Sequence, residues 1–471
     1  MKEEFFFNDE LIARFKTMIK EKRVSYFDPG EFADIIMYYL DLSDLEYAAK
    51  ALSLAKTQHP YDAEIKIREA EVFLAYGNLP EAVQLIEELK HIVPNHTDFL
   101  IMQAKYWSLS RASLKAISFY KEALKNAEDE NYLYSSIGDE YLRIQEIRKA
   151  LYHFKKALEF YPRDEYAFYS CIQCFDEIHL YKECVHFLNQ YLDIQPYSEV
   201  AWFQLGLKQL KLKNYHEAHV AFDYAIVIDN TFLNAYDQKA RCLEQMHRYN
   251  EAIKVYEEAF HLEKSPALAY FKIGLCYNKM EEPLRALRFF QQAIYGDPQL
   301  EKSWSQSAFI YERFGNYQKA LCYLSKAIDL SRNNLIYWKH SVYLNLQLGY
   351  YEEAIIAYQK ILQLQPDWYD HWMNCSKLLM KVGDYHQVIK LLKKAFNKFG
   401  KFGELNYYIS CCYFLIKQEK EGLIELAKAI EAAPELCKVV MSKYPFIFRK
   451  NLVKKFLTKF HFSSEGDKRL F

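Results

Sequence analysis

The feature that most constrains this 471-residue chain is a repeat, because the same kinds of residue return every 34 positions. With Pro29 as position one, the register runs without an insertion. A unit of this length cannot bury its apolar face alone, so neighbouring units must stack on one another. The twelve predicted units begin at Pro29, Ala63, Thr97, Asn131, Glu165, Glu199, Leu233, Ala267, Glu301, Leu335, Tyr369 and Gly403.

Within a unit, small residues alternate with large ones at fixed places. Positions eight and twenty are usually small, as in Gly206 and Ala218, while positions four and twenty-four are usually large, as in Trp202 and Phe222. Rings can fill the spaces that small side chains leave between helices. Proline stands at position thirty-two in seven units, where it ends the second helix. Glycine near position fifteen, as in Gly77, separates the two helices.

This pattern resembles the tetratricopeptide repeat family over about 408 of the 471 residues. The resemblance implies an all-α, right-handed superhelical solenoid of about twelve helix-turn-helix repeats with helical caps, whose first helices line a concave surface. We expect an N-terminal capping helix in residues 1–28, the repeat array in 29–436 and a basic amphipathic cap and tail in 437–471. Irregular packing is expected where a polar residue occupies position seven, as Glu69, Gln103 and Lys239 do.

Composition narrows the classes of function that the chain can serve. Its 61 Lys and Arg balance 62 Asp and Glu, so no net charge attracts nucleic acid or an anionic membrane. The N-terminus lacks the basic and apolar regions of a secretory signal, and no apolar run reaches the roughly 18 residues of a membrane span. We therefore predict a cytoplasmic protein whose ten cysteines are reduced.

The resemblance also implies where a partner would bind. In the family, the concave groove is formed by positions two, five, six, nine, twelve and thirteen of each first helix. Position five is largely apolar here, which suits a groove that grips apolar side chains of a peptide. The alternative is that these residues only pack between neighbouring first helices. The predicted partner-binding residues are Tyr169, Phe203, Phe271, Lys272, Lys302, Phe309, Arg313, Lys339, Tyr343, Lys377 and Lys381.

Charge along this predicted groove is uneven, so a partner with an acidic segment would favour the C-terminal half. The alternative is an ordinary solvated surface. Acids dominate in the first five units, with Asp34, Asp41, Glu64, Glu71, Asp98, Asp139, Asp176 and Glu177 against Arg68, Lys105 and Arg143. Bases dominate in the seventh to eleventh units, with Arg241, Lys272, Lys279, Lys302, Arg313, Lys339, Lys377 and Lys381 against Asp237, Glu244, Glu312 and Asp370.

One specialised site of the family is not expected. The clamp that holds a chaperone's C-terminal carboxylate needs Lys and Asn on one first helix, Asn on the next, and Lys and Arg on the third. The corresponding set, Lys339, Tyr343, Asn374, Glu404 and Tyr408, fits at two of five places, and Glu404 carries the wrong charge. We therefore predict no binding of a chaperone tail.

Metal and catalytic motifs fail on their context. The spacing of Cys171, Cys174, His179 and Cys184 matches a zinc knuckle, but no glycine follows the second cysteine, and the thiols fall at packing positions of the repeat. The histidines of His216-Glu217-Ala218-His219 are three apart, whereas a zinc-binding helix needs four. No phosphate loop or nucleophile motif occurs. We predict no cofactor, no metal and no enzymatic activity.

The C-terminal segment carries a second hypothesis. Apolar residues at helical spacing, among them Phe448, Val453, Leu457 and Phe460, stand opposite a set of lysines and arginines. Such a helix can lie on an anionic membrane or bind RNA phosphates, or it can simply cap the last repeat. The main prediction is a non-enzymatic scaffold or adaptor that binds partner proteins, and the alternative is a peripheral membrane or nucleic-acid factor acting through this tail.

Overall fold

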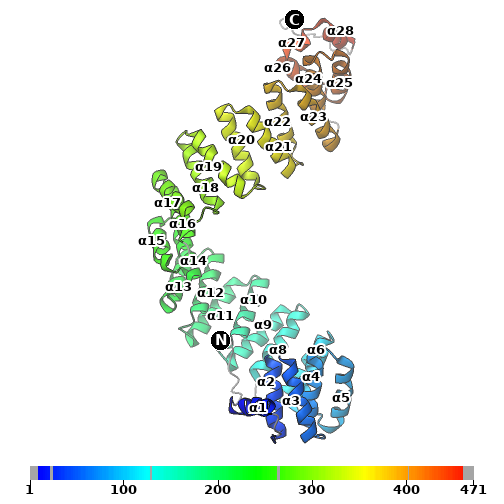
Figure 1. Cartoon of the computed structure of the whole chain (residues 1–471), viewed down its shortest axis with the longest axis vertical. Coiled ribbons are helices and arrows are strands. Elements are labelled where there is room, and N and C mark those ends of the chain that lie inside the picture. The colour runs from blue at the N-terminus through cyan, green and yellow to red at the C-terminus, as the bar shows by residue number, and fades with distance from the viewer. Residues whose placement is uncertain (1–8, 22–24, 128–129, 263–265, 401–402, 460–471) are drawn as a thin grey trace. The chain divides into compact units, whose positions relative to one another are not determined.

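The computed structural model describes residues 9–21, 25–127, 130–262, 266–400 and 403–459. Helices make up all the regular structure in these ranges, and they follow one another as antiparallel pairs (Figure 1). The chain divides into two compact units, unit 1 (Met1–Gln238) and unit 2 (Lys239–Phe471). The fold is an all-α solenoid of tetratricopeptide-type hairpins, as the sequence predicted.

Unit 1 begins with the cap helix α1 (Asp9–Glu21) and continues as six hairpins. Their first helices are α2 (Pro29–Asp41), α4 (Ala63–Ala75), α6 (Thr97–Leu109), α8 (Glu130–Arg143), α10 (Glu165–Glu177) and α12 (Glu199–Lys211). Their second helices are α3 (Leu45–Gln58), α5 (Leu79–Ile92), α7 (Ser113–Ala123), α9 (Ile147–Phe160), α11 (Tyr181–Ile194) and α13 (Tyr215–Ile228).

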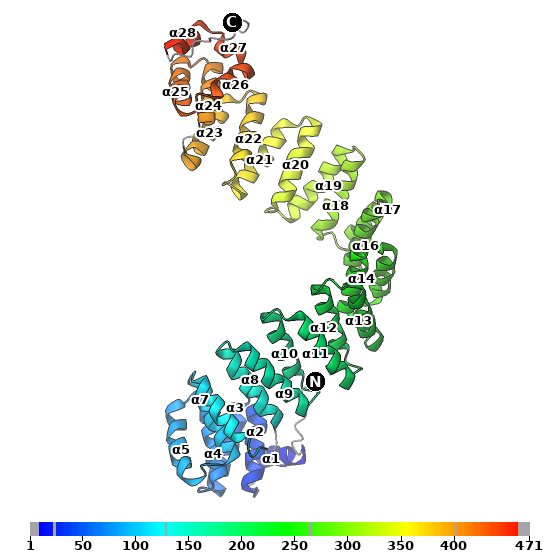
Figure 2. The same cartoon turned by 180° about the vertical axis from the view of Figure 1, so that it is seen from behind.

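Unit 2 continues the same alternation, which Figure 2 shows from behind. The division from unit 1 falls within a first helix, α14 (Leu233–Gln245). The other first helices are α16 (Ala267–Lys279), α18 (Glu301–Arg313), α20 (Leu335–Leu348), α22 (Tyr369–Val382) and α24 (Gly403–Leu415). The second helices are α15 (Tyr249–Glu258) with the short η1 (Ala259–His261), α17 (Pro283–Gly296), α19 (Tyr317–Leu330), α21 (Tyr351–Leu364), α23 (Tyr385–Phe399) and α25 (Glu419–Ala432). The C-terminal helices are α26 (Leu436–Lys443), α27 (Pro445–Phe448) and α28 (Asn451–Lys459).

The contact between small and large residues confirms the pairing that the repeat predicted. A Cβ atom on Gly206 would stand 2.5 Å from the ring of Phe222, which is fully buried. Gly274 meets Phe290 in the same way, at 2.6 Å. Glycine at position eight therefore lets the ring at position twenty-four fill the space inside the hairpin.

Tryptophan at position four fixes the turn that precedes its helix. The indole Nε1 of Trp202 donates a hydrogen bond of 2.9 Å to the carbonyl of Pro196, and Trp372 makes the same bond to Pro366 at 2.9 Å. A buried indole N–H needs such a partner. The proline and the tryptophan of the repeat thus form one device that joins consecutive hairpins.

The turn inside each hairpin has a feature that the sequence did not reveal. Position fifteen adopts a positive φ in every repeat, although only four of these residues are glycine. A left-handed conformation costs a residue with a side chain about 1–2 kcal/mol, so packing of the two helices must impose it. The residues concerned are Gly77, Gly315, Gly349 and Gly383, together with Ser43, Arg111, Gln145, His179, Lys213, His247, Glu281 and Lys417.

Both ends of the described chain are closed by apolar contacts. Helix α1 buries Phe15 and Met18 in a cluster with residues of α2 and α3. At the other end, Phe448, Val453 and Leu457 join the cluster of α24 and α25, so the apolar side of α28 faces the repeats. Phe460, which was part of the predicted apolar pattern, lies outside the described residues. Among described residues, none of the helices has the length and apolar character to cross a membrane.

Candidate functional site

Position five of the first helices is mostly part of the core, which corrects two of the predicted partner-binding residues. Phe271 is 8% exposed and packs on Phe290 with ring centroids 5.7 Å apart, so it lines no groove. Phe203 is half-buried between Phe222 and Phe232, at 5.5 and 4.8 Å. Both rings pack against the second helix of their own hairpin.

Tyr169 is the exception at position five, since 47% of it is exposed. It lines a hollow of about 760 Å³ in unit 1, between α10 and α12. Three carboxamides, those of Gln173, Gln204 and Gln238, line the same hollow. Sequence reasoning missed these glutamines, although they occupy groove positions six and nine, because it weighed only rings and charges there.

A charge network at the start of unit 1 is closed on itself. The guanidinium of Arg68 donates to Glu71 at 2.7 Å and also to Asp98. Lys105, one repeat later, donates to the other oxygen of Glu71 at 2.8 Å. Burial alone would raise the pKa of Glu71, but the two cations outweigh it and lower this pKa to about 2. The network therefore joins α4 to α6 and offers no unpaired carboxylate at Glu71.

Three further carboxyl groups lie near this network, and burial has the largest effect on their pKa values. Burial raises the pKa of Asp34, Asp41 and Glu64, and the nearby cations only partly oppose it. These groups share Arg68 and Lys105 with Glu71, so no cation is left to hold them fully ionised. The predicted excess of acidic residues in this half is present in the sequence. Most of these residues, however, interact with other side chains of unit 1.

Pairing between neighbouring repeats continues along unit 1. Ser108 donates to Glu140 at 2.5 Å, and Arg143 lies 3.2 Å from the same carboxylate. Lys208 on α12 is 5% exposed and donates to both oxygens of Asp176 on α10, at 2.7 and 2.6 Å. The three predicted cations of this half, Arg68, Lys105 and Arg143, are therefore bonded within unit 1, as is Lys208 of the sixth repeat.

Unit 2 presents a different surface, which we call the basic face. Phe309 and Tyr343, at position nine of α18 and α20, are 38% and 43% exposed. Lys302 and Lys377 are exposed, and their ammonium groups form no hydrogen bond or ion pair to any residue that the structure describes. The basic face comprises Lys302, Phe309, Arg313, Lys339, Tyr343, Lys377 and Lys381.

The remaining cations of the basic face have weak or neutral partners. Arg313 donates to the side-chain oxygen of Asn278 at 3.1 Å, and Lys381 donates to the hydroxyl of Tyr351 at 2.9 Å. Lys339 lies 5.0 Å above the ring of Trp368. None of these contacts neutralises the positive charge. Lys272, the other predicted cation, is half-buried beside Tyr256 at 5.4 Å and lies on α16.

One contact between α18 and α20 supports a ring of this face. His340 is buried, stacks on Phe309 with centroids 4.2 Å apart, and places Nε2 on the carboxylate of Glu312. This contact fixes Phe309 on the surface, because the imidazole behind it is held from α18. One oxygen of Glu312 is therefore engaged with His340 inside unit 2.

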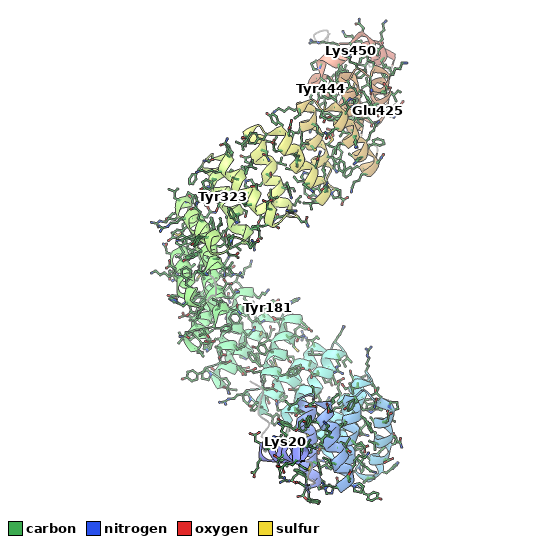
Figure 3. The ribbon with its side chains drawn as sticks, in the orientation of Figure 1. Lys20, Tyr181, Tyr323, Glu425, Tyr444 and Lys450 are labelled. Carbon is green, nitrogen blue, oxygen red and sulfur yellow. The ribbon has the colours of Figure 1, made fainter. Side chains whose placement is uncertain are left out.

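The basic face ends at α22, because the C-terminal segment covers the next first helix. Tyr407 and Tyr408 of α24 are 0% and 3% exposed. The hydroxyl of Tyr444 lies 3.7 Å from the sulfur of Met380, and its ring centroid is 6.2 Å from that of Tyr408. Figure 3 labels Tyr444 and Lys450 in this part of unit 2. Lys450 itself lies 3.1 Å from Glu419.

The cysteine cluster is a packing feature. Cys171, Cys174 and Cys184 are buried, and burial raises the pKa of the last two thiols to about 12. His179 stands in the turn with a positive φ and bonds the hydroxyl of Tyr181 at 3.1 Å. Within the described ranges, no group of three His, Cys, Asp or Glu side chains is placed to hold a metal ion.

These observations define a helical-repeat protein with a solenoid fold and a polar first-helix face. The tetratricopeptide repeat family model matches residues 233–265, 301–334 and 336–367. The repeat positions and the helix bounds agree with it, and the chain is a tetratricopeptide repeat protein.

Known proteins resemble the chain over part of their length. It is 25% identical over 230 residues to a tetratricopeptide repeat protein 21 homolog of Caenorhabditis elegans, covering 45% of this chain and 17% of that protein. It is 23% identical over 257 residues to the human protein O-mannosyl-transferase TMTC3, covering 49% of this chain and 28% of that protein. The chain thus spans less than a third of these curated relatives.

Solved structures resemble the fold at low identity. YrrB, described as a protein with an unusual peptide-binding site, is 16% identical with a TM-score of 0.32, covering 40% of this chain and 97% of that one. The hetero-tetramer Cut9-Hcn1 of the APC/C is 14% identical with a TM-score of 0.32, covering 95% of this chain and 92% of that one.

Proposed function

We propose that this protein is a non-enzymatic scaffold that binds an acidic segment of a partner protein on the basic face of unit 2. The observation that carries the proposal is the combination of unpaired cations, Lys302 and Lys377, with exposed rings, Phe309 and Tyr343. Rings held on rigid helices are typical anchors of protein interfaces. Cations around them favour an acidic partner and speed its association.

The chemistry of the chain supports a role in binding within the cytoplasm. The structure describes all ten cysteines, and each is a free thiol, which suits a reducing compartment. Tetratricopeptide repeats serve protein interaction, and a fold alone does not supply an activity. The transferase among the relatives is matched over only 28% of its length, so its activity is not proposed here.

A photo-crosslinking experiment on the full chain tests the proposal. p-Benzoylphenylalanine replaces Tyr343 or Phe309, and mass spectrometry identifies the segment of the partner that is captured from native lysate. We expect segments with net negative charge and at least one large apolar residue. Tyr152 on α9 is 57% exposed and provides the control position, from which the same segments should not be captured. Neutral or basic segments captured at both positions of the basic face would contradict the proposal.

A charge-neutral variant then tests the cations. Lys302→Gln combined with Lys377→Gln should weaken binding of the captured segment about two- to thirtyfold, because each exposed charge contributes roughly 0.2–1 kcal/mol. The salt dependence of binding should fall with it. Fluorescence anisotropy of the labelled segment at 50 and 300 mM salt measures both effects. An unchanged affinity at both salt concentrations would exclude these lysines from the interface.

A further inference from the structure

A hollow lies in the second-helix layer of unit 2, away from every residue of the basic face. It has a volume of about 370 Å³ and lies between α21 and α23, above α22. Its floor is apolar and already packed, since Trp372 is 8% exposed and Leu379 3%. The lining residues are Gln359, Leu362, Gln363, Trp372, Cys375, Leu379, Gln387, Lys390, Leu391 and Lys394.

The hollow lies where the eleventh repeat lacks a ring that the eighth and ninth repeats have. In α17 and α19, position twenty-three carries Phe289 and Tyr323, whose rings lie 6.2 and 5.5 Å from the position-four rings of their own hairpins. Figure 3 labels Tyr323 on α19. In α23 this position is Leu391, which is shorter and leaves the space beside Trp372 open. The eleventh repeat therefore has an aromatic floor without the ring that closes it in the eighth and ninth repeats.

The rim of the hollow carries positive charge and no opposing carboxylate. Helix α23 contains four lysines and no acid. Lys393 donates to the hydroxyl of Tyr413 at 2.8 Å, and Lys398 lies 2.7 Å from Asp367. The other two, Lys390 and Lys394, are exposed at the rim and have no partner among the residues that the structure describes.

The two rim lysines oppose one another. They stand one helical turn apart, and like charges at this spacing destabilise a helix. The rest of the rim is made of glutamine carboxamides, which can donate and accept hydrogen bonds but carry no charge. A group that fits the hollow must therefore have an apolar part for the floor and negative charge for the lysines.

We propose that this hollow is a second protein-docking site, in which a partner segment inserts one apolar side chain beside Trp372 and sets carboxylates on Lys390 and Lys394. The occupant is an acidic segment with an apolar residue between its carboxylates. The site lies on second helices and shares no residue with the basic face. This proposal does not depend on the proposed function of the basic face.

Fluorine NMR on the full chain tests this site directly. The chain is labelled with 5-fluorotryptophan, which gives six signals for its six tryptophans, and Trp372→Phe assigns the relevant one. The probe is the peptide acetyl-Glu-Asp-Leu-Asp-Glu-amide, and its uncharged counterpart is acetyl-Gln-Asn-Leu-Asn-Gln-amide. We expect the acidic peptide to shift the Trp372 signal at millimolar concentration, and the neutral peptide to bind at least about fivefold more weakly. An equal shift with both peptides, or none with the acidic one, would overturn the proposal.

Matched variants separate the charge of the rim from the shape of the hollow. Lys390→Gln with Lys394→Gln should remove the difference between the two peptides. Lys326→Gln is the control, because Lys326 occupies the same repeat position as Lys394 on α19, where Tyr323 fills the space. Leu391→Tyr should abolish the shift without changing any charge. A retained difference between the peptides in the lysine variant, or a retained shift in Leu391→Tyr, would refute the site.

Two further experiments test the chemical class of the ligand and whether its binding is independent of the basic face. Sodium dodecanoate is titrated in place of the peptides, and a Trp372 shift with this anion but not with the acidic peptide would replace the protein partner by a small amphipathic molecule. The Lys302→Gln, Lys377→Gln double variant should show the same Trp372 shift as the original chain. Loss of the shift in that variant would show that the probe acts through the basic face and would also overturn the proposal.

Discussion

The two units use charged residues of their first helices for different purposes. In unit 1, Glu71 joins Arg68 to Lys105, and Asp176 takes up Lys208. In unit 2, Lys302 and Lys377 project from equivalent helices with no partner among the described residues. The difference lies in whether the neighbouring repeat supplies the opposite charge. Where it does, the charges join one repeat to the next, and where it does not, they are left for another molecule.

This contrast shows that residue counts alone do not identify a charged binding surface. A buried, bonded ion pair contributes little net stability, but it fixes the register of the elements that it joins. The same side chains without internal partners change stability little and are open to a ligand. Breaking a pair in unit 1 should therefore lower stability and leave binding unchanged. Removing a cation in unit 2 should weaken binding and leave stability nearly unchanged.

The largest effect is expected for Glu71→Leu in unit 1. The substitution leaves Arg68 and Lys105 without their shared carboxylate, and removing one partner from a buried pair costs about 3–5 kcal/mol. Hydrogen exchange measured by mass spectrometry should show the loss of protection in α4 and α6 but not in α20. Glu87→Leu on α5 is the control, because that carboxylate is exposed and lies 3.9 Å from Lys90. Equal protection in the Glu71 and Glu87 variants would show that the network has no structural role.

Acid titration of unit 1 should reveal the same carboxylate. The pKa of Glu71 is about 2 in the folded chain and 4.5 ordinarily, so its contribution is complete above pH 4.5 and is lost as the pH falls towards 2. This contribution amounts to about 3 kcal/mol at most. The raised pKa values of Asp34, Asp41 and Glu64 act in the opposite direction, because protonating these groups relieves the folded state.

Hydrogen exchange from pH 6 to pH 2.5 separates these contributions. It is measured in α4 and α6 of the original chain and of Glu71→Gln. Intrinsic exchange rates at each pH provide the correction. The original chain should lose protection below pH 4.5. The variant should have less protection at pH 6 and should lose less of it as the pH falls. Parallel curves for the two proteins would assign the acid sensitivity to other carboxyls.

The sequence predicted the repeat well because periodicity reports packing that recurs. Where position eight is glycine, position twenty-four carries a phenylalanine, and the Gly206–Phe222 contact shows how the two residues fit together. The left-handed turn at position fifteen was only partly visible, because residues such as Arg111 and Lys213 adopt it without glycine. The helices on either side impose this conformation, and these residue types have no intrinsic preference for it that the sequence could reveal.

The candidate site was predicted less well, for a physical reason. A ring at position five can point into a groove or between helices, and the outcome depends on how close the next first helix lies. Phe271 is buried and packs on Phe290, whereas Tyr169 is exposed. Equally, the charge of Lys208 gave no sign that Asp176, 32 residues away, would take it up.

The hydrophobic core should be equally sensitive in both units, which limits the contrast to the polar face. Gly206→Ala in unit 1 and Gly274→Ala in unit 2 each place a methyl group 2.5–2.6 Å from a buried ring. Overpacking costs about 1–3 kcal/mol, and better helix propensity returns about 1 kcal/mol. Exchange protection of α12 and α16 should fall to a similar extent, and Phe222→Leu or Phe290→Leu added to the respective variant should relieve the clash. A loss confined to one unit would mean that the cores differ as well.

The smallest effects provide the most direct test of the contrast, because they compare one substitution at two lysines. Lys208→Gln removes a buried cation and leaves Asp176 without its partner, so protection in α10 and α12 should fall by about 1 kcal/mol. Lys302→Gln removes an exposed cation without a described partner, so protection in α18 should change by less than about 0.5 kcal/mol. Binding of an acidic segment should reverse this order, with Lys302→Gln weakening it and Lys208→Gln leaving it intact. A protein in which both substitutions destabilise equally, or in which Lys208→Gln alone weakens binding, would not divide its charges between structure and recognition as unit 1 and unit 2 do here.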